Sequence, residues 1–325
     1  MKAPKLGLAV AVAAALVLSA CSSGKDNNKD SSASGSNSDL KICMYTHGDG
    51  GGFWSVAKKG AEQAAKDLGV TLDYQESNND AEAQAQLIEA GVTGGCDGIA
   101  VSAPNPDAIQ GAMDKANDAG IPLVTMNSGS ADFLKLHAFT HVGQDEFIAG
   151  QQAGLKFKEL GATKILCPIQ EANNIGLQQR CDGAKDTFGN VETLQLSAGL
   201  QDLTKSEAEI QAKLEADTDI DAVFSLNADI ATGSSMPASD AVGRDIINGT
   251  VDLSGDAVQA IIDGKLAFAI DQQQYAQGYL PIVLLYLNKI NGHVLGGGQP
   301  MYTGPGFVTQ DNAAQVQKLA AAGTR

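Results

Sequence analysis

The chain has 325 residues, with 22 Lys and Arg against 38 Asp and Glu, and therefore a formal net charge of −16 at pH 7. This charge argues against nucleic acid as a partner, because phosphates require a basic protein face. It also argues against an anionic ligand attracted by the long-range field of the protein. The length suffices for one large domain or two medium-sized ones.

The N-terminal residues 1–20 have the pattern of a secretory signal peptide. Lys2 and Lys5 give a positive start, and an apolar run covers residues 6–17. That run is shorter than the ~20 apolar residues that span a bilayer. It ends in Leu-Ser-Ala before Cys21, which resembles the lipobox of bacterial lipoproteins, where the thiol is lipidated. An ordinary signal peptide with an incidental cysteine is the alternative.

Residues 21–38 predict a lipidated cysteine followed by a flexible linker. Beyond Cys21 they are rich in Ser, Gly and Asn, and Ala33 is their one apolar side chain. Such a segment cannot bury enough surface to offset the entropy of ordering. We therefore expect export and lipid anchoring at the outer face of the cytoplasmic membrane or in the periplasm, with no other contact with the membrane.

From residue 40 onward, short β-rich runs alternate with helical patterns. Gly69 and Gly120 end two of the helices, as glycine commonly does. Such alternation predicts a parallel sheet covered by helices on both faces. We predict strands over 40–45, 70–74, 98–101 and 121–125, with helices over 55–68, 81–92 and 106–119.

The same alternation restarts after residue 138 and predicts a second open sheet. Two open sheets in one chain imply two lobes, and ligands of open sheets lie outside the carboxyl ends of the strands. A ligand would lie between the lobes if both edges face each other. We predict strands over 138–142, 164–167, 191–196, 222–226, 246–249 and 266–270, with helices over 146–160 and 275–289.

The segments that follow the predicted strands contain groups suited to recognition. They hold Asn, Gln, Asp, one Arg and two adjacent aromatic residues, and no nucleophile–base pair stands out. Amide side chains match hydroxyls, because both donate and accept hydrogen bonds. We expect neither an enzyme nor a cofactor. His137 and His141 lie four apart on a predicted loop and strand, so we expect no metal site there either.

Four cysteines follow Cys21, and an even number in an exported chain permits disulfides. Three pairings are open, and the short separation of Cys167 from Cys181 favours that pair. Four buried thiols are the alternative. The spacing does not fit a zinc site made of cysteines alone. The other two residues of the set are Cys43 and Cys96.

Seven stretches between residues 40 and 308 resemble the type I periplasmic binding proteins of the ribose- and galactose-binding cluster. The resemblance implies two doubly wound parallel-sheet α/β lobes joined by a three-strand hinge. It places the crossings near 143–145, 271–272 and 302–306. The lobes would comprise 39–143 plus about 272–303, and 144–271 plus about 304–325. In chain order the stretches are THGDGGGFWSVAKKGAE, CDGIAVSAPNPDA, AGIPLVTMNSG, HVGQDEFIAGQQAG, GLQQRCDGAKD, AVFSLNADIA and FAIDQQQYAQGYL.

The resemblance implies ligand contacts from the first lobe. Phe53 and Trp54 occupy the place of paired aromatics that stack on a sugar ring. Asn127 stands where the family has an Asp that contacts hydroxyls. Ribose binders carry an Arg after that Asp, whereas this chain has Ser128, which argues against ribose itself.

The resemblance also implies contacts from the second lobe and the hinge. Arg180 matches an arginine whose planar fork suits vicinal hydroxyls. Asn227 and Asp252 match residues that follow two successive strands, and Gln272 matches a Gln at the second crossing.

Two further segments offer candidate contacts. The loop over 47–52 is longer and richer in glycine than in ribose binders, and His47 and Asp49 are candidates within it. The loop that carries Glu171, Asn173 and Asn174 would face the cleft and contribute one more contact.

The resemblance implies a monomeric substrate-binding protein of an ABC importer. It would deliver a neutral sugar or polyol, such as a pentose, hexose, inositol or sugar alcohol, to a membrane permease. The alternative is a sensory or chemotaxis receptor that uses the same closed form. A dehydrogenase would need a GxGxxG turn after the first strand, and a related repressor would need a DNA-binding headpiece before Leu40. The sequence has neither.

Overall fold

The computed structural model describes residues 39–325. The predicted signal peptide, the predicted lipidation at Cys21 and the linker up to residue 38 therefore lie outside the described residues. The first sheet has the order β11-β5-β4-β3-β1-β2, and all its pairings are parallel. Its strands are β1 (Lys41–Thr46), β2 (Thr71–Glu76), β3 (Gly98–Ser102), β4 (Leu123–Met126), β5 (His141–Gly143) and β11 (Met301–Tyr302).

The second sheet repeats this arrangement in the order β12-β10-β9-β8-β6-β7. It is parallel except for β12, which pairs with β10 in the antiparallel direction. The two sheets confirm the predicted fold class of two α/β lobes. The strands are β6 (Ile165–Ile169), β7 (Val191–Gln195), β8 (Ala222–Ser225), β9 (Ile247–Val251), β10 (Phe268–Asp271) and β12 (Gly306–Val308).

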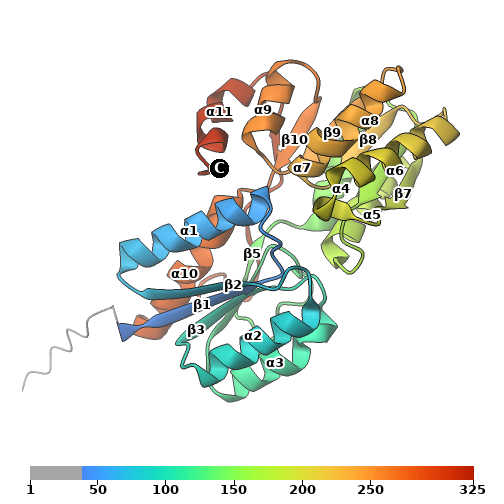
Figure 1. Ribbon diagram of the computed structural model, residues 1–325. Coiled ribbons are helices and arrows are strands. Elements are labelled where there is room, and N and C mark those ends of the chain that lie inside the picture. The colour runs from blue at the N-terminus through green and yellow to red at the C-terminus, as the bar shows by residue number, and fades with distance from the viewer. Residues whose placement is uncertain (1–38) are drawn as a thin grey trace, which may run out of the picture. The chain divides into compact units, whose positions relative to one another are not determined.

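Four long helices cover the first sheet, two on each face (Figure 1). Ile42 and Met44 of β1 point toward α1 and α10, whereas Cys43 and Tyr45 point toward α2 and α3. Both faces of the strand are buried, as a parallel sheet between helices requires. The helices are α1 (Gly52–Leu68), α2 (Ala81–Thr93), α3 (Pro106–Asp118) and α10 (Gln274–Asn291).

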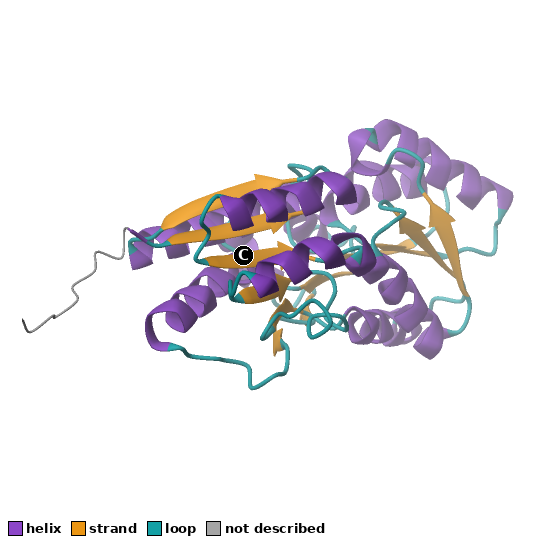
Figure 2. Ribbon diagram, turned by 90° about the horizontal axis from the view of Figure 1, so that it is seen from below, coloured by secondary structure: helices purple, strands orange, loops and turns teal. Residues whose placement is uncertain are grey.

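The second sheet also lies between helices, as the layers in Figure 2 show. Phe157 of α4, Phe224 of β8 and Phe268 of β10 form the centre of one core. The helices are α4 (Glu146–Glu159), α5 (Ile175–Phe188), α6 (Leu203–Ala216), α7 (Ala228–Ile230), α8 (Met236–Ala241), α9 (Gly255–Ile262) and α11 (Ala313–Ala321), with a 3₁₀ turn over Gly199–Gln201 and a π turn over Ala231–Ser235.

Helices α4 and α5 pack against each other at a distance that only glycine permits. A Cβ atom on Gly150 would overlap the carbonyl oxygen of Arg180, and one on Gly183 would overlap that of Phe147. The α1–α10 pair is built in the same way, since a Cβ on Gly278 would overlap the carbonyl oxygen of Ala57. In both lobes, two helices are therefore in direct backbone contact.

The chain passes between the two sheets three times. It leaves β5 for α4, leaves β10 for α10, and passes from β11 to β12. Most predicted elements agree with the structure to within a few residues. Helix α1 begins three residues before its predicted start, because Gly51 is already the extended residue that precedes it. Strand β5 is shorter than predicted and begins only at His141.

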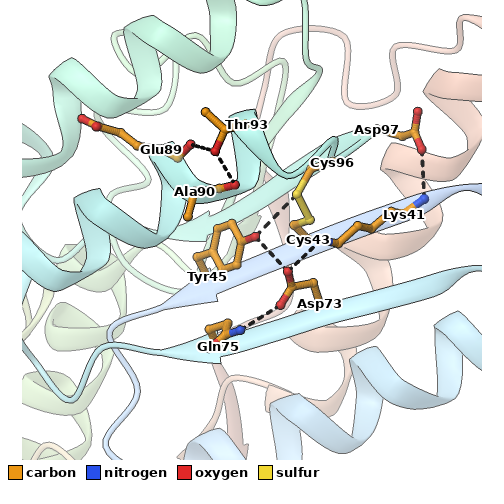
Figure 3. The surroundings of a disulfide bond; sticks show 10 residues. All are labelled: Lys41, Cys43, Tyr45, Asp73, Gln75, Glu89, Ala90, Thr93, Cys96 and Asp97. Carbon is orange, nitrogen blue, oxygen red and sulfur yellow. Dashed lines mark hydrogen bonds and ion pairs between the residues drawn. A yellow bond between two sulfur atoms is a disulfide. The ribbon is translucent and has the colours of Figure 1, made fainter.

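Each lobe contains one disulfide. Cys167 of β6 is bonded to Cys181 of α5, which is the pair that proximity in the sequence favours. Cys43 of β1 is bonded to Cys96, just before β3, and the Tyr45 hydroxyl lies beside it (Figure 3). The sequence separations are 14 and 53. On a chain-entropy basis, such loops stabilise the fold by roughly 3 and 4 kcal/mol respectively.

Candidate ligand-binding site

A pocket of about 390 Å³ lies where segments after the strands of both sheets meet. We call it the primary pocket. Of the residues that the sequence marks as candidate contacts, Asn173 does not line this pocket. The others do: His47, Asp49, Phe53, Trp54, Asn127, Glu171, Asn174, Arg180, Asn227, Asp252 and Gln272.

The first-lobe wall is aromatic. Phe53 and Trp54 lie in the first turn of α1, and both are buried. The Trp54 ring meets the Phe53 ring edge to face at 4.9 Å between centroids, and it meets the His47 ring in the same way at 4.7 Å. These contacts fix the orientation of the indole without occupying side-chain polar groups of the pocket.

Asn127 follows β4 with a φ of 60°, a left-handed conformation that Asn tolerates better than most residues. Its backbone N–H donates to the Val142 carbonyl at 3.0 Å, which holds the residue at the end of the sheet. The Ser128 hydroxyl donates to Asn127 Oδ1 at 3.0 Å and lies 3.2 Å from Asn174 Oδ1 of the second lobe. Ser128, which the sequence marks only as a departure from ribose binders, also lines the pocket.

Arg180 is buried in the second-lobe wall, at 4% exposure. Its Nε donates to Glu146 Oε2 at 2.6 Å, and its Nη1 donates to the Leu226 carbonyl at 2.8 Å. Burial alone would lower the pKa of Arg180, but Glu146, together with Asp252 and Glu171, outweighs this effect and raises the pKa. The guanidinium is therefore positively charged, and the Glu146 carboxylate already neutralises this charge before any ligand binds.

Sequence reasoning missed Glu146. It is the first residue of α4, a position where an acidic side chain usually faces solvent, yet it is only 1% exposed. Besides Arg180, it accepts a hydrogen bond from Gln144 Nε2 at 2.9 Å. No sequence signal distinguishes it from Asp145, which caps the same helix.

Asp252, Asn227 and Gln272 form a connected group. Gln272 Nε2 donates to Asp252 Oδ1 at 2.5 Å, and Asn227 Nδ2 lies 3.4 Å from Asp252 Oδ2. Burial raises the pKa of Asp252 to about 7, although Arg180 opposes this shift. Gln277 Nε2 donates to Gln272 Oε1 at 2.9 Å, which orients the amide at the second crossing.

His47, Glu171 and Asn174 meet at one end of the pocket. Burial, helped by Arg180, lowers the pKa of His47 to about 3, so its imidazole is neutral. Its Nδ1 lies 2.7 Å from Ser102 Oγ, and its Nε2 lies 3.4 Å from Asn174 Nδ2. Asn174 Nδ2 donates to Glu171 Oε2 at 2.7 Å, and burial raises the pKa of Glu171 to about 7. The 3.7 Å contact between His47 and Glu171 is therefore no ion pair at neutral pH.

The two histidines that lie four apart are engaged separately. His137 contacts Asp114 at 2.8 Å, and His141 contacts Thr125 at 3.0 Å. Within residues 39–325, no group of three or more His, Cys, Asp or Glu side chains could hold a metal ion. No helix in this part of the chain is long and apolar enough to cross a membrane.

Comparison with known proteins identifies the family. The family model described as a periplasmic binding protein domain matches residues 42–292. A carbohydrate transporter from Acidothermus cellulolyticus 11B, solved in complex with myo-inositol, is 38% identical, with a TM-score of 0.85 over 88% of this chain and 99% of that chain. The ribose import binding protein of Bacillus subtilis is 27% identical over 81% of this chain and 86% of that protein.

A third relative is named for two pentoses. The xylose/arabinose-binding protein of Sulfolobus acidocaldarius is 25% identical over 84% of this chain and 71% of that protein. All three relatives are named for carbohydrates or their transport. The chain belongs to the type I periplasmic binding proteins, a family of solute-binding proteins rather than enzymes.

Proposed function

We propose that the protein is the substrate-binding component of an ABC importer and captures a neutral sugar or polyol in the primary pocket. The class comprises pentoses, hexoses, inositols and sugar alcohols. The observation that carries the proposal is the composition of the pocket wall, which joins an aromatic pair to amide, carboxylate and guanidinium groups. The aromatic faces suit the C–H side of a sugar ring, and the polar groups match its hydroxyls.

The charge balance of the pocket supports a neutral ligand. The one cationic side chain of its wall, Arg180, is already paired with Glu146. No free positive charge in the described pocket wall is therefore left to attract a carboxylate or phosphate. Arg180 can still donate to a hydroxyl, because a guanidinium has five N–H donors and two hydrogen bonds occupy only part of them.

Ligand binding would stabilise the closed arrangement of the lobes. Contacts with both walls favour the state in which the walls are close together, and the shift is limited by the difference in affinity between the two states. The Gly52 N–H of the first lobe donates to Asp229 Oδ2 at 3.1 Å, and the Ile175 N–H of the second lobe donates to the Pro104 carbonyl at 3.0 Å. These two hydrogen bonds between the lobes and the bound ligand would all favour the closed arrangement.

The cellular setting that we propose rests on the sequence. Residues 1–20 would direct export, and lipid on Cys21 would hold the monomeric protein at the outer face of the cytoplasmic membrane or in the periplasm. There the closed form would dock on the permease. Presentation of the same closed form to a chemotaxis or kinase partner is the alternative use of the complex.

A thermal-shift screen of the purified protein tests the ligand class. The panel contains pentoses, hexoses, inositols, sugar alcohols and amino acids, with myo-inositol first because the 38% identical relative was solved with it. A ligand at ~100 times its Kd adds about 2.7 kcal/mol, which raises the melting temperature by several degrees. A shift with sugars or polyols alone is the expected result. A shift with amino acids alone would reject the class.

A further inference from the structure

A second cavity adjoins the primary pocket. Its volume is about 620 Å³, and it lies between first-lobe residues at the start of α2 and α3 and the second-lobe loop over 170–174. The candidate contacts expected from the sequence centre on the primary pocket rather than on this cavity. Its lining residues are His47, Asn79, Ala81, Gln84, Pro104, Asn105, Gln170, Glu171, Ala172, Asn173 and Asn174.

Four residues separate the two cavities and line both of them: His47, Gln170, Glu171 and Asn174. His47 belongs to the first lobe and the other three to the second, so this partition forms only where the lobes meet. Asn174 is held across the lobes by Ser128, whose Oγ lies 3.2 Å from Asn174 Oδ1, and His47 Nε2 lies 3.4 Å from Asn174 Nδ2. The contact of Glu171 across the lobes is longer, at 3.7 Å from His47 Nε2 to Glu171 Oε2, so Glu171 is the most weakly held of these residues.

Glu171 is the movable part of this partition. Its carboxyl group contacts Asn174 and His47, whereas Asn174 is also fixed as the cap of α5, with Oδ1 accepting from the Gly176 N–H at 3.0 Å. A rotation of Glu171 therefore costs one hydrogen bond and leaves the helix cap intact. Such a rotation would connect the primary pocket with the second cavity.

The lining of the second cavity suits a neutral hydroxylated group. It has amide side chains at Asn79, Asn105 and Asn173, and apolar surface at Ala81 and Pro104. Amides match hydroxyls, and the apolar residues match the C–H face of a ring.

A buried acceptor in the partition points to a ligand donor. Gln170 is 9% exposed, and its Oε1 has no hydrogen-bond partner within residues 39–325. A buried amide oxygen without a partner is costly, and a hydroxyl of a ligand that spans the partition would satisfy it.

We propose that the two cavities are subsites of one site for a glycoside, with a polyol ring in the primary pocket and a glycosidically linked second sugar ring in the second cavity. This inference rests on the proposed function, because it extends the same ligand class from one ring to two. Glu171 would rotate to let the glycosidic oxygen pass, and Gln170 would accept a hydrogen bond from a ligand hydroxyl.

Titration calorimetry with matched probes tests the proposal on the purified full chain. The pairs are myo-inositol with galactosyl-myo-inositol, xylose with xylobiose, and glucose with maltose. In at least one pair, the two-ring probe should bind about tenfold or more tightly than its parent, because it adds hydrogen bonds without a second loss of translational freedom. Two-ring probes that bind no better than a parent that does bind would overturn this inference and leave the proposed function standing. Failure of every one- and two-ring probe would overturn both.

A pair of tryptophan variants locates the second ring. Ala172 is exposed and lines only the second cavity, so Ala172→Trp should fill that cavity without disturbing the core. We expect it to reduce the affinity for the two-ring probe to that for the parent, while the parent binds as before. Ala119→Trp, at an exposed position at the end of α3, is the matched control and should change neither affinity. An advantage of the two-ring probe that survives in Ala172→Trp would overturn the proposal.

Discussion

The two walls of the primary pocket differ in the ionisable groups that they bury. The first-lobe wall has two aromatic rings, an amide, the partly exposed carboxyl group of Asp49, and His47, whose imidazole stays neutral because burial lowers its pKa to about 3. The second-lobe wall contains the buried Arg180–Glu146 pair and Asp252, whose pKa burial raises to about 7. The comparison indicates that the first lobe supplies shape, whereas the second supplies strong hydrogen bonds that depend on protonation.

The largest effect should follow from breaking the ion pair of the second lobe. Arg180→Ala leaves Glu146 buried without its cation, and removal of one partner of a buried pair costs about 3–5 kcal/mol of folding free energy. The loss of a charge-assisted hydrogen bond should also weaken ligand binding at least ~10-fold. Urea unfolding and calorimetry measure the two effects. Unchanged affinity in a folded Arg180→Ala protein would remove this residue from the site.

The two disulfides, one in each lobe, allow the stability of the two lobe cores to be compared. Replacing Cys43 and Cys96 by serine should cost about 4 kcal/mol, and replacing Cys167 and Cys181 about 3 kcal/mol, because the first pair closes the longer loop. Affinity should fall only in the second variant, since Cys181 adjoins Arg180 on α5. Guanidinium unfolding together with calorimetry gives both values. Equal losses of affinity in the two variants would contradict this expectation.

The pH dependence of stability should have opposite signs in the two walls. Asp252 keeps its proton in the folded protein up to about pH 7, whereas the unfolded chain loses it near 3.8, so this residue makes the fold less stable as pH rises from about 4 to about 7. His47 contributes stability that is present above pH 6.5 and is lost as pH falls toward about 3.

Asp252→Asn isolates the acidic half of that comparison. We expect the unfolding free energy of the wild type minus that of the variant to decrease between about pH 4 and about pH 7 and then to stay level. In this range the wild type loses the Asp252 proton when it unfolds, whereas the variant has no proton to lose at this position. Urea unfolding across this range measures the difference. A difference that does not vary with pH would show that Asp252 titrates normally in the folded protein.

The smallest effect should come from Asn127, an uncharged residue of the first-lobe wall. Asn127→Ala removes one uncharged hydrogen-bonding group from the pocket, which is worth about 1 kcal/mol, or roughly a fivefold loss of affinity. Asn127→Asp is the conservative comparison, because it keeps the acceptor and the shape. Calorimetry with the same ligand distinguishes the two. A loss as large as that of Arg180→Ala would mean that the first lobe carries more of the affinity than its composition indicates.

Much of the fold and the composition of the pocket could be predicted from the sequence. Strand and helix periodicities locate most elements, and the ends of parallel strands bring Asn127 and Asp252 to the same region. Glu146 could not be found in this way, because its burial depends on how α4 meets α5. The Cys43–Cys96 bond and the second cavity likewise depend on contacts between segments far apart in the chain.

The glycine contacts between paired helices bear on any attempt to redesign the specificity of this protein. Because α4 and α5 touch through Gly150 and Gly183, and α1 and α10 through Gly278, these helices have no side-chain layer that could be thinned or thickened to shift them. Mutational libraries aimed at new ligands should therefore leave these glycines unchanged. Diversity is better placed in the loops over 47–52 and 170–174, where a longer or shorter segment changes the cavity and leaves the scaffold in place.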